Sequence, residues 1–252
     1  RDGWLWSHDV SVMGGKLGAL MGACASEYLH AVAVKANPVV AILRRLVERG
    51  AGLECASMEE VAISLRAGCS PDRIVFDSPA ETRRDLAEAR DLGVVLNADN
   101  FDELERIGAL LEQPDRGALR ARVGLRINPM VGEGAIAATS VGGRVSKFGV
   151  PLEEAQRPIV EAFERWPWLT GVHVHVGSQG CTVAQLIAAA ERIEALIATI
   201  EALRPGQIVD VDIGGGLPVA YDSTTTPPCV TTYADARRGA CPTPMAGRYR
   251  PT

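Results

Sequence analysis

The chain has only three lysines among its 26 basic residues, and one of them, Lys35, stands at the end of a short apolar run. Arginine serves a protein surface as well as lysine, but its guanidinium stays protonated and cannot form a Schiff base. The run Ala31 to Val34 predicts a short buried strand, and barrels and open α/β sheets carry their chemistry at the carboxyl ends of such strands. Lys35 is therefore a candidate catalytic residue. The alternative is an ordinary strand-end lysine that extends into solvent.

Three consecutive glycines, Gly214, Gly215 and Gly216, follow the apolar and acidic segment 208–213. Glycine lets successive backbone N–H groups converge on an anion. The loop after the seventh strand of a barrel is the usual place for a phosphate group. The position of the triplet therefore favours a phosphate site over a plain tight turn.

His173 and His175 are two residues apart and would face the same side of a strand. Because no carboxylate or cysteine stands at a usable spacing, the pair does not predict a zinc site, and we expect no metal. A polar layer inside a barrel is the alternative for these histidines. His175 lies nearer the carboxyl end of the strand, where it can meet a ligand, and Ser178 offers a hydroxyl group to a phosphate.

Two further charged residues, Arg126 and Glu54, follow apolar residues in the segments 123–127 and 52–55 in the same way. Each could be an ordinary surface residue, although Arg126 would suit an oxyanion if it shared a rim with a cofactor. A strand-end lysine, a glycine turn and a histidine beside a serine together match a pyridoxal-phosphate site. In such a site the lysine forms an imine and a glycine-rich backbone holds the phosphate.

Short apolar runs alternate with amphipathic segments along the chain. The candidate strands are 31–35, 52–56, 73–76, 94–97, 122–127, 171–176 and 208–213. The candidate helices are 38–49, 57–67, 80–91, 101–112, 152–165 and 182–203. Ser57 with Glu60, and Asn100, predict two of the helix starts. Repeated strand–helix units imply a parallel sheet. Polar residues after nearly every strand, Asn97 and Asp212 among them, favour a TIM barrel over a doubly wound sheet.

The overall composition is that of an ordinary globular protein, with 47% hydrophobic and 23% charged residues. The net charge of −5 argues against a nucleic-acid surface. No apolar run approaches the length of a membrane span, and no signal peptide is visible. The six cysteines are scattered, which suits a reducing cytosol. We therefore expect a cytoplasmic protein with no nucleic-acid or membrane partner.

Six sequence blocks, in order, resemble the fold-type III pyridoxal-phosphate decarboxylases. This group contains the diaminopimelate, ornithine and arginine decarboxylases and has an alanine-racemase-like barrel. The blocks are residues 33–38 (AVKANP), 50–57 (GAGLECAS), 125–129 (LRINP), 146–149 (SKFG), 173–179 (HVHVGSQ) and 212–216 (DIGGG). Ser178 followed by Gln179 is more like the diaminopimelate enzymes than the eukaryotic ornithine enzymes.

The resemblance implies that pyridoxal phosphate contacts eight positions: Lys35, Glu54, Arg126, His175, Ser178, Gly214, Gly215 and Gly216. Lys35 and His175 would be the catalytic residues, with Lys35 forming the imine and His175 stacking on the pyridine ring. Ser178 and the three glycines would hold the phosphate. Glu54 occupies a position near the imine that is usually aspartate, and Arg126 matches an arginine near the phenolic oxygen of the ring.

The function implied is decarboxylation of a basic or dibasic amino acid, with meso-diaminopimelate converted to lysine as the leading expectation. The alternatives are an ornithine or arginine decarboxylase, an amino-acid racemase and a non-catalytic barrel that binds pyridoxal phosphate. Racemases of this fold usually carry a Tyr-Gly-His-Gly-like continuation after the lysine block, whereas Pro38 follows here. The family also implies a small-molecule substrate and a homodimer of the full-length form.

Two parts of the family pattern have no counterpart in this sequence. One is a Glu-Pro-Gly-Arg-like strand whose acid pairs with the pyridine nitrogen, and the other is a C-terminal β-domain. We expect residues 1–222 to form an incomplete barrel that lacks its eighth strand. Residues 223–252 are expected to be irregular, with one short helix. Alone, such a chain would be weakly active or inactive.

Overall fold

The computed structural model describes residues 7–24, 26–112, 121–131, 146–177, 181–220, 226–240 and 250–252. Its strands are β1 (Ala31–Ala33), β2 (Gly52–Cys55), β3 (Ile74–Asp77), β4 (Val95–Ala98), β5 (Arg122–Asn128), β6 (Val150–Pro151), β7 (Leu169–Val174), β8 (Asp210–Asp212) and β9 (Arg250–Pro251). They form one sheet in the order β1-β2-β3-β4-β5-β7-β8-β9, with β6 paired to β5 beside this path. Every pair is parallel.

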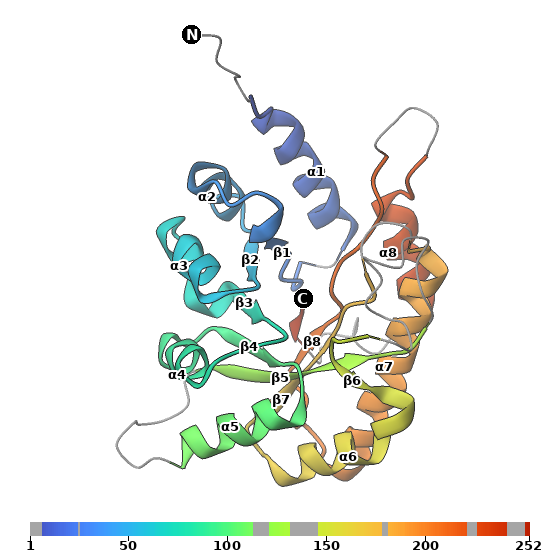
Figure 1. Ribbon diagram of the computed structural model, residues 1–252. Helices are drawn as coiled ribbons and strands as arrows, with labels where there is room; N and C mark the ends of the chain where they lie inside the picture. Colours follow the sequence, from blue (N-terminus) through green and yellow to red (C-terminus); the bar gives the residue numbers. More distant parts are fainter. Residues whose placement is uncertain are drawn as a thin grey trace.

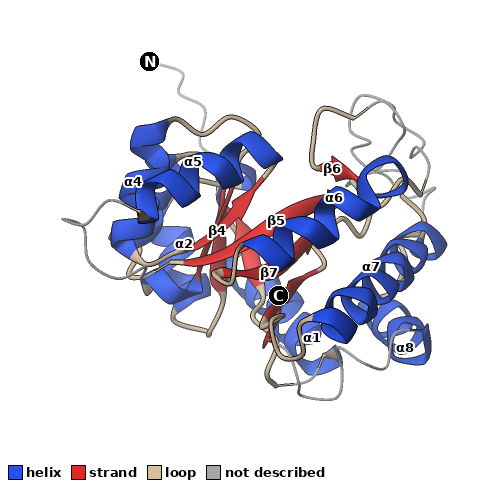
Figure 2. Cartoon of the chain, turned by 90° about the horizontal axis from the view of Figure 1, so that it is seen from below, coloured by secondary structure: helices blue, strands red, loops and turns tan. Residues whose placement is uncertain are grey.

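Helices surround this curled sheet on its outside, as Figures 1 and 2 show. They are α1 (Val10–Ala23), α2 (Val40–Val47), α3 (Met58–Arg66), α4 (Arg83–Leu92), α5 (Phe101–Leu111), α6 (Leu152–Arg165), α7 (Val183–Leu203) and α8 (Val230–Ala240), with short 3-10 turns at Val34–Ala36 and Pro71–Arg73. A buried aliphatic core fills the space between helices and sheet, in which Leu43, Leu104 and Ile193 are typical members. The architecture is that of an α/β barrel, as predicted.

The helix starts that the sequence predicted have the expected caps. The Ser57 hydroxyl accepts a hydrogen bond from the Glu60 N–H at the start of α3, and Asn100 accepts one from the Glu103 N–H at the start of α5. Glu60 departs from a full capping box, because its carboxylate accepts from the N–H of Ala56 instead of that of Ser57. Both caps start their helices shortly after the ends of β2 and β4.

The eighth strand needs a correction. We expected it to be absent, but β9 pairs with β8 over two residues, and the Leu29 N–H donates to the Pro251 carbonyl at 2.9 Å. The ring nevertheless remains incomplete, because β9 and β1 form no ladder in the described part of the chain. The expectation of an incomplete barrel is therefore confirmed.

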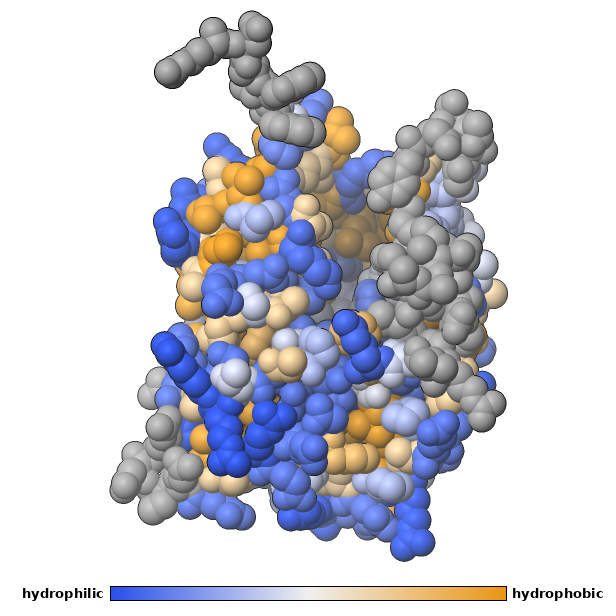
Figure 3. All heavy atoms as spheres, in the orientation of Figure 1, coloured by the Kyte–Doolittle hydropathy of each residue, from blue (hydrophilic) through white to orange (hydrophobic). Residues whose placement is uncertain are grey.

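Helix α1 was not predicted. Its sequence contains four glycines and does not alternate between apolar and polar residues at the helical period. Its start is fixed by Asp9, whose side chain accepts from the N–H groups of Ser11 and Val12. Val12 of α1 is 58% exposed, and Val39, directly before α2, is 48% exposed. Figure 3 shows hydrophobic residues in the upper part of the molecule as drawn there. No helix in the described ranges is long and apolar enough to cross a bilayer.

Candidate active site

Lys35 and Glu54 meet at the carboxyl ends of β1 and β2. Lys35 lies in the 3-10 turn Val34–Ala36 directly after β1, because the strand ends at Ala33, two residues before the end of the predicted strand 31–35. Its Nζ atom is 3.3 Å from Glu54 Oε1 and 3.4 Å from Oε2. The lysine side chain is 60% exposed and the glutamate 19%. The amine is therefore held by a carboxylate and still open to a ligand from the rim.

The pKa of the Glu54 carboxylate depends on its burial and on Lys35 beside it. Burial raises the pKa of Glu54 above its ordinary value, and the ammonium of Lys35 opposes that shift. A partly desolvated carboxylate beside an amine is suited to hold a proton or to release it to the neighbouring group.

His175 and the glycine turn lie together at the ends of β7 and β8. A Cβ atom on Gly214 would come within 2.5 Å of the Val174 carbonyl oxygen and 2.8 Å of His175 Nδ1. Gly214 also has a φ of +62° and Gly216 one of +119°, a region that favours glycine. At Gly215, by contrast, an added Cβ would meet nothing within 4 Å. The turn therefore packs tightly against β7 through Gly214 and faces open space at Gly215.

His175 is neutral near pH 7 in this setting. Burial, together with the positive charges of His173, Arg126 and Lys35, lowers the pKa of His175 to about 4. A neutral imidazole can pack flat against an aromatic ring without carrying a charge into it.

Arg126 is bound below the rim. Its Nη1 donates to Asp77 Oδ2 at 2.9 Å and lies 3.8 Å from Asp99 Oδ1. The guanidinium carbon is 4.6 Å from the centre of the Phe148 ring, which packs over it. Asp99 in turn accepts from the Gly149 N–H at 3.0 Å, so Arg126 and Asp99 fix the segment that enters β6.

His173 lies between two buried carboxylates that sequence reasoning did not connect with it. Its Nε2 is 3.3 Å from Asp77 Oδ2 and its Nδ1 is 3.0 Å from Asp212 Oδ2. Burial alone would lower the pKa of His173, but Asp212 and Asp77 outweigh it and raise the pKa to about 10. The polar layer considered for His173 is therefore an ion cluster. Asp77 could have been found from the same strand-end pattern, since it follows Ile74, Val75 and Phe76.

A second buried acidic group lies beside this cluster. The Glu103 carboxylate accepts from the N–H groups of Asp99 and Glu81, which ties together the loops after β3 and β4. Burial and the nearby Glu103 raise the pKa of Glu81 to about 10, so Glu81 is protonated at neutral pH. In the described ranges, no set of three or more His, Cys, Asp and Glu side chains is arranged to hold a metal ion.

Ser178 lies outside the described residues, so its predicted phosphate contact stays a prediction. Lys35, Glu54, His175 and the glycine turn all belong to the same end of the sheet, because each lies near or just after the carboxyl end of its strand, and Arg126 lies two residues before the end of β5, below them. All pairs of strands are parallel, which brings these ends to one rim.

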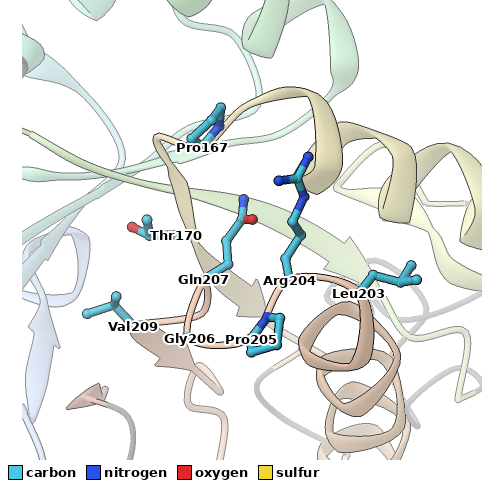
Figure 4. A pocket seen from close by; sticks show the side chains of 8 residues that line it. All are labelled: Pro167, Thr170, Leu203, Arg204, Pro205, Gly206, Gln207 and Val209. Atoms are coloured by element: carbon cyan, nitrogen blue, oxygen red, sulfur yellow. The ribbon is translucent and has the colours of Figure 1, made fainter.

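A hollow of about 450 Å³ lies at the opposite end of the barrel, between the loops that enter β7 and β8 (Figure 4). Gln207 fills part of it and donates to the carbonyl oxygens of Phe163, Trp166 and Leu169. Arg204 donates to the carbonyl of Glu164. These side chains bind backbone groups of the loops, so we assign the hollow a structural role.

The sequence matches, over residues 19–247, the family described as pyridoxal-dependent decarboxylase, pyridoxal binding domain. The chain belongs to this family. The match confirms the resemblance seen in the six sequence blocks, and pyridoxal phosphate is the cofactor of the family.

Curated proteins of similar sequence are diaminopimelate decarboxylases. The chain is 35% identical to that of Zymomonas mobilis over 224 residues, which cover 86% of this chain and 51% of the relative. It is 30% identical to that of Methanothermobacter thermautotrophicus over 207 residues, 82% of this chain and 47% of the relative. The chain thus spans about half the length of the curated relatives it matches.

Solved structures confirm the barrel. The diaminopimelate decarboxylase of Helicobacter pylori complexed with L-lysine matches with a TM-score of 0.84 and 26% identity, covering 97% of this chain and 61% of that one. The arginine decarboxylase of the Paramecium bursaria Chlorella virus matches with a TM-score of 0.73 and covers 95% of this chain and 60% of that one. Its 22% identity makes this second likeness one of fold alone.

The raised pKa of His173 predicts how the free energy of unfolding changes with pH. Its pKa is raised from an ordinary value near 6.5 to about 10 in the folded chain. The stabilisation from this proton is therefore complete below about pH 6.5 and is lost as the pH rises through about 10. We expect His173→Gln to lower the free energy of unfolding most near pH 6.5, and the gap to wild type to narrow toward pH 10. Urea unfolding at a series of pH values measures this gap, and a gap that stays constant would contradict the imidazolium assignment.

Proposed function

We propose that the protein containing this chain is a pyridoxal-phosphate-dependent decarboxylase that converts meso-diaminopimelate to lysine. The observation that carries the proposal is the pairing of Lys35 with Glu54 on the same rim as the glycine turn, in a chain of the pyridoxal-binding family. The substrate is supported by relatives named diaminopimelate decarboxylase and by a similar structure with L-lysine bound. Lysine is what remains when diaminopimelate loses one carboxyl group.

The residues of the rim fit the cofactor. Lys35 supplies an amine that is exposed toward the rim, and Glu54 holds it in place. The neutral imidazole of His175 is suited to lie against the pyridine ring. The N–H of Gly214 already donates to Asp212 Oδ1 at 2.8 Å, so we assign the phosphate to the N–H groups of Gly215 and Gly216. Arg126 would reach the phenolic oxygen from below, and Ser178 would add a hydroxyl group to the phosphate.

The chemistry divides between cofactor and chain. When bound, pyridoxal phosphate supplies an electron-accepting ring that stabilises the negative charge left on the substrate after carbon dioxide departs. Lys35 is the residue that would hold the cofactor through its amine. Glu54 is placed to take the proton that the Lys35 ammonium must lose before its nitrogen can act as a nucleophile.

Three statements about the whole protein belong to the same proposal. We propose that it works in the cytoplasm, since the five cysteines in the described ranges form no disulfide. We propose a homodimer on the basis of the family resemblance, with no nucleic-acid partner at a net charge of −5. An ornithine or arginine substrate remains the alternative, and the match to a decarboxylase family disfavours racemisation.

The cofactor assignment predicts one labelled lysine. We expect borohydride reduction of the chain with pyridoxal phosphate, followed by peptide mapping, to place the label on Lys35. Lys35→Arg keeps the positive charge but cannot form a Schiff base, so it serves as the control and should remain unlabelled. A label on Lys16 or Lys147 in the wild-type chain would overturn the assignment.

The substrate assignment predicts selective release of carbon dioxide. We expect the whole protein to release it from meso-diaminopimelate, with a kcat/KM at least about tenfold higher than for ornithine or arginine, or about 1.4 kcal/mol in the barrier. Equal or greater turnover of ornithine or arginine would contradict the substrate assignment and identify the protein as an ornithine or arginine decarboxylase. Absence of turnover with all three, in protein that carries the Lys35 label, would leave a cofactor-binding barrel without this activity.

A further inference from the structure

Three charged residues stand side by side on three neighbouring strands beneath the rim. In the sheet register Arg126 of β5 is paired with His173 of β7, and His173 is paired with Asp212 of β8. Residues paired in this way point to the same face of a sheet. Asp77 of β3 reaches the same place from across the curled sheet and contacts both Arg126 and His173 through Oδ2. The layer therefore joins strands that are not neighbours.

The Asp212 carboxylate links this layer to the glycine turn. Its Oδ2 atom is 3.0 Å from His173 Nδ1, while its Oδ1 atom accepts a hydrogen bond from the Gly214 N–H at 2.8 Å. One carboxylate thus has one oxygen on the buried histidine and the other on the first residue of the turn. Rotation of the Asp212 side chain would break both contacts together.

Besides Asp212, two contacts hold the entry to the glycine turn: the Ile213 N–H donates to the Thr252 carbonyl oxygen at 3.2 Å, and Gly214 packs closely against β7. Gly214 sits against the carbonyl of Val174 and the ring of His175, and both belong to the chain that directly follows His173. Asp212 is buried, so its carboxylate needs a charged partner to avoid a large desolvation cost. His173 is that partner, and it is closed off from solvent between Asp77 and Asp212.

We propose that His173 is a positioning residue for the phosphate site: through Asp212 it sets the orientation of the turn Gly214 to Gly216. The inference rests on the proposed function, because it assigns the phosphate of the cofactor to this turn. His173 itself contacts neither the phosphate nor Lys35. Its effect should therefore appear in the affinity for the phosphate group and spare the reaction of the lysine with the aldehyde.

A pair of ligands separates these two effects. Pyridoxal phosphate and pyridoxal carry the same aldehyde and ring, but pyridoxal has no phosphate. Both are titrated against the wild-type chain and against His173→Gln, with the visible absorption of the bound ligand as the readout. We expect His173→Gln to weaken binding of pyridoxal phosphate about tenfold or more, the low end for loss of a supporting outer-shell partner, and to change pyridoxal binding less than about twofold.

Two further variants calibrate the experiment. His30→Gln is the matched control, because His30 stacks on Tyr28 before β1 and has no part in the layer, so both affinities should stay unchanged. Gly215→Val is the positive control. It places a side chain where the turn faces open space and should block the phosphate selectively without a clash inside the protein.

The outcomes separate this inference from the function on which it rests. If the wild type binds pyridoxal phosphate at Lys35 and His173→Gln weakens both ligands equally, or neither, His173 does not position the turn and the proposed function stands. If the wild type binds neither ligand, both proposals fall. Should circular dichroism show that His173→Gln is unfolded, Asp212→Asn breaks the same link at similar size. A selective loss for the phosphate ligand then supports the inference, and an equal loss overturns it.

Discussion

The site depends on one buried interaction, the ion cluster in which His173 lies between Asp77 and Asp212. A histidine closed off from solvent keeps its proton because two carboxylates face it, and its charge in turn stabilises both carboxylates, together with Arg126 at Asp77 and the Gly214 N–H at Asp212. The cluster ties the ends of β3, β7 and β8 together inside a ring that is not fully closed. The groups that would contact a cofactor stand directly above it.

The buried layer beneath the rim, here called the floor, and the rim itself have different roles in this arrangement. The floor, which is the buried layer of Asp77, Arg126, His173 and Asp212, holds opposite charges in ion pairs, with Arg126 joined to Asp77 and covered by Phe148. The rim holds the groups to which we assign the chemistry, such as the exposed amine of Lys35 and the neutral ring of His175. The positive charges of the floor contribute to keeping His175 neutral. A charged layer beneath the rim can therefore add to the effect of burial on the pKa of His175 without contacting a ligand.

Much of this could be predicted from sequence, and the failures have physical causes. Apolar runs located seven strands, and the strand-end rule correctly placed Lys35, Glu54 and His175 at one end of the sheet, because both signals are local. Helix α1 was not predicted, because its glycines and uniform apolarity hide the helical period. Strand β9 was not predicted, because Arg250 and Pro251 form no apolar run. The ion pairs of His173 could not be predicted from the residues near it in sequence. Asp77 is distant in the sequence and contacts His173 only because the sheet curls.

The most direct test of this account is the protonation of the two histidines, followed by 15N NMR of histidine-labelled protein across a pH titration. The account predicts that His173 keeps both ring protons from acidic pH to beyond pH 8, since its pKa is raised to about 10. It also predicts that His175 stays neutral down to about pH 5, since its pKa is lowered to about 4. Titration of both rings near 6.5, the ordinary value, would show that the charged layer does not exist as described.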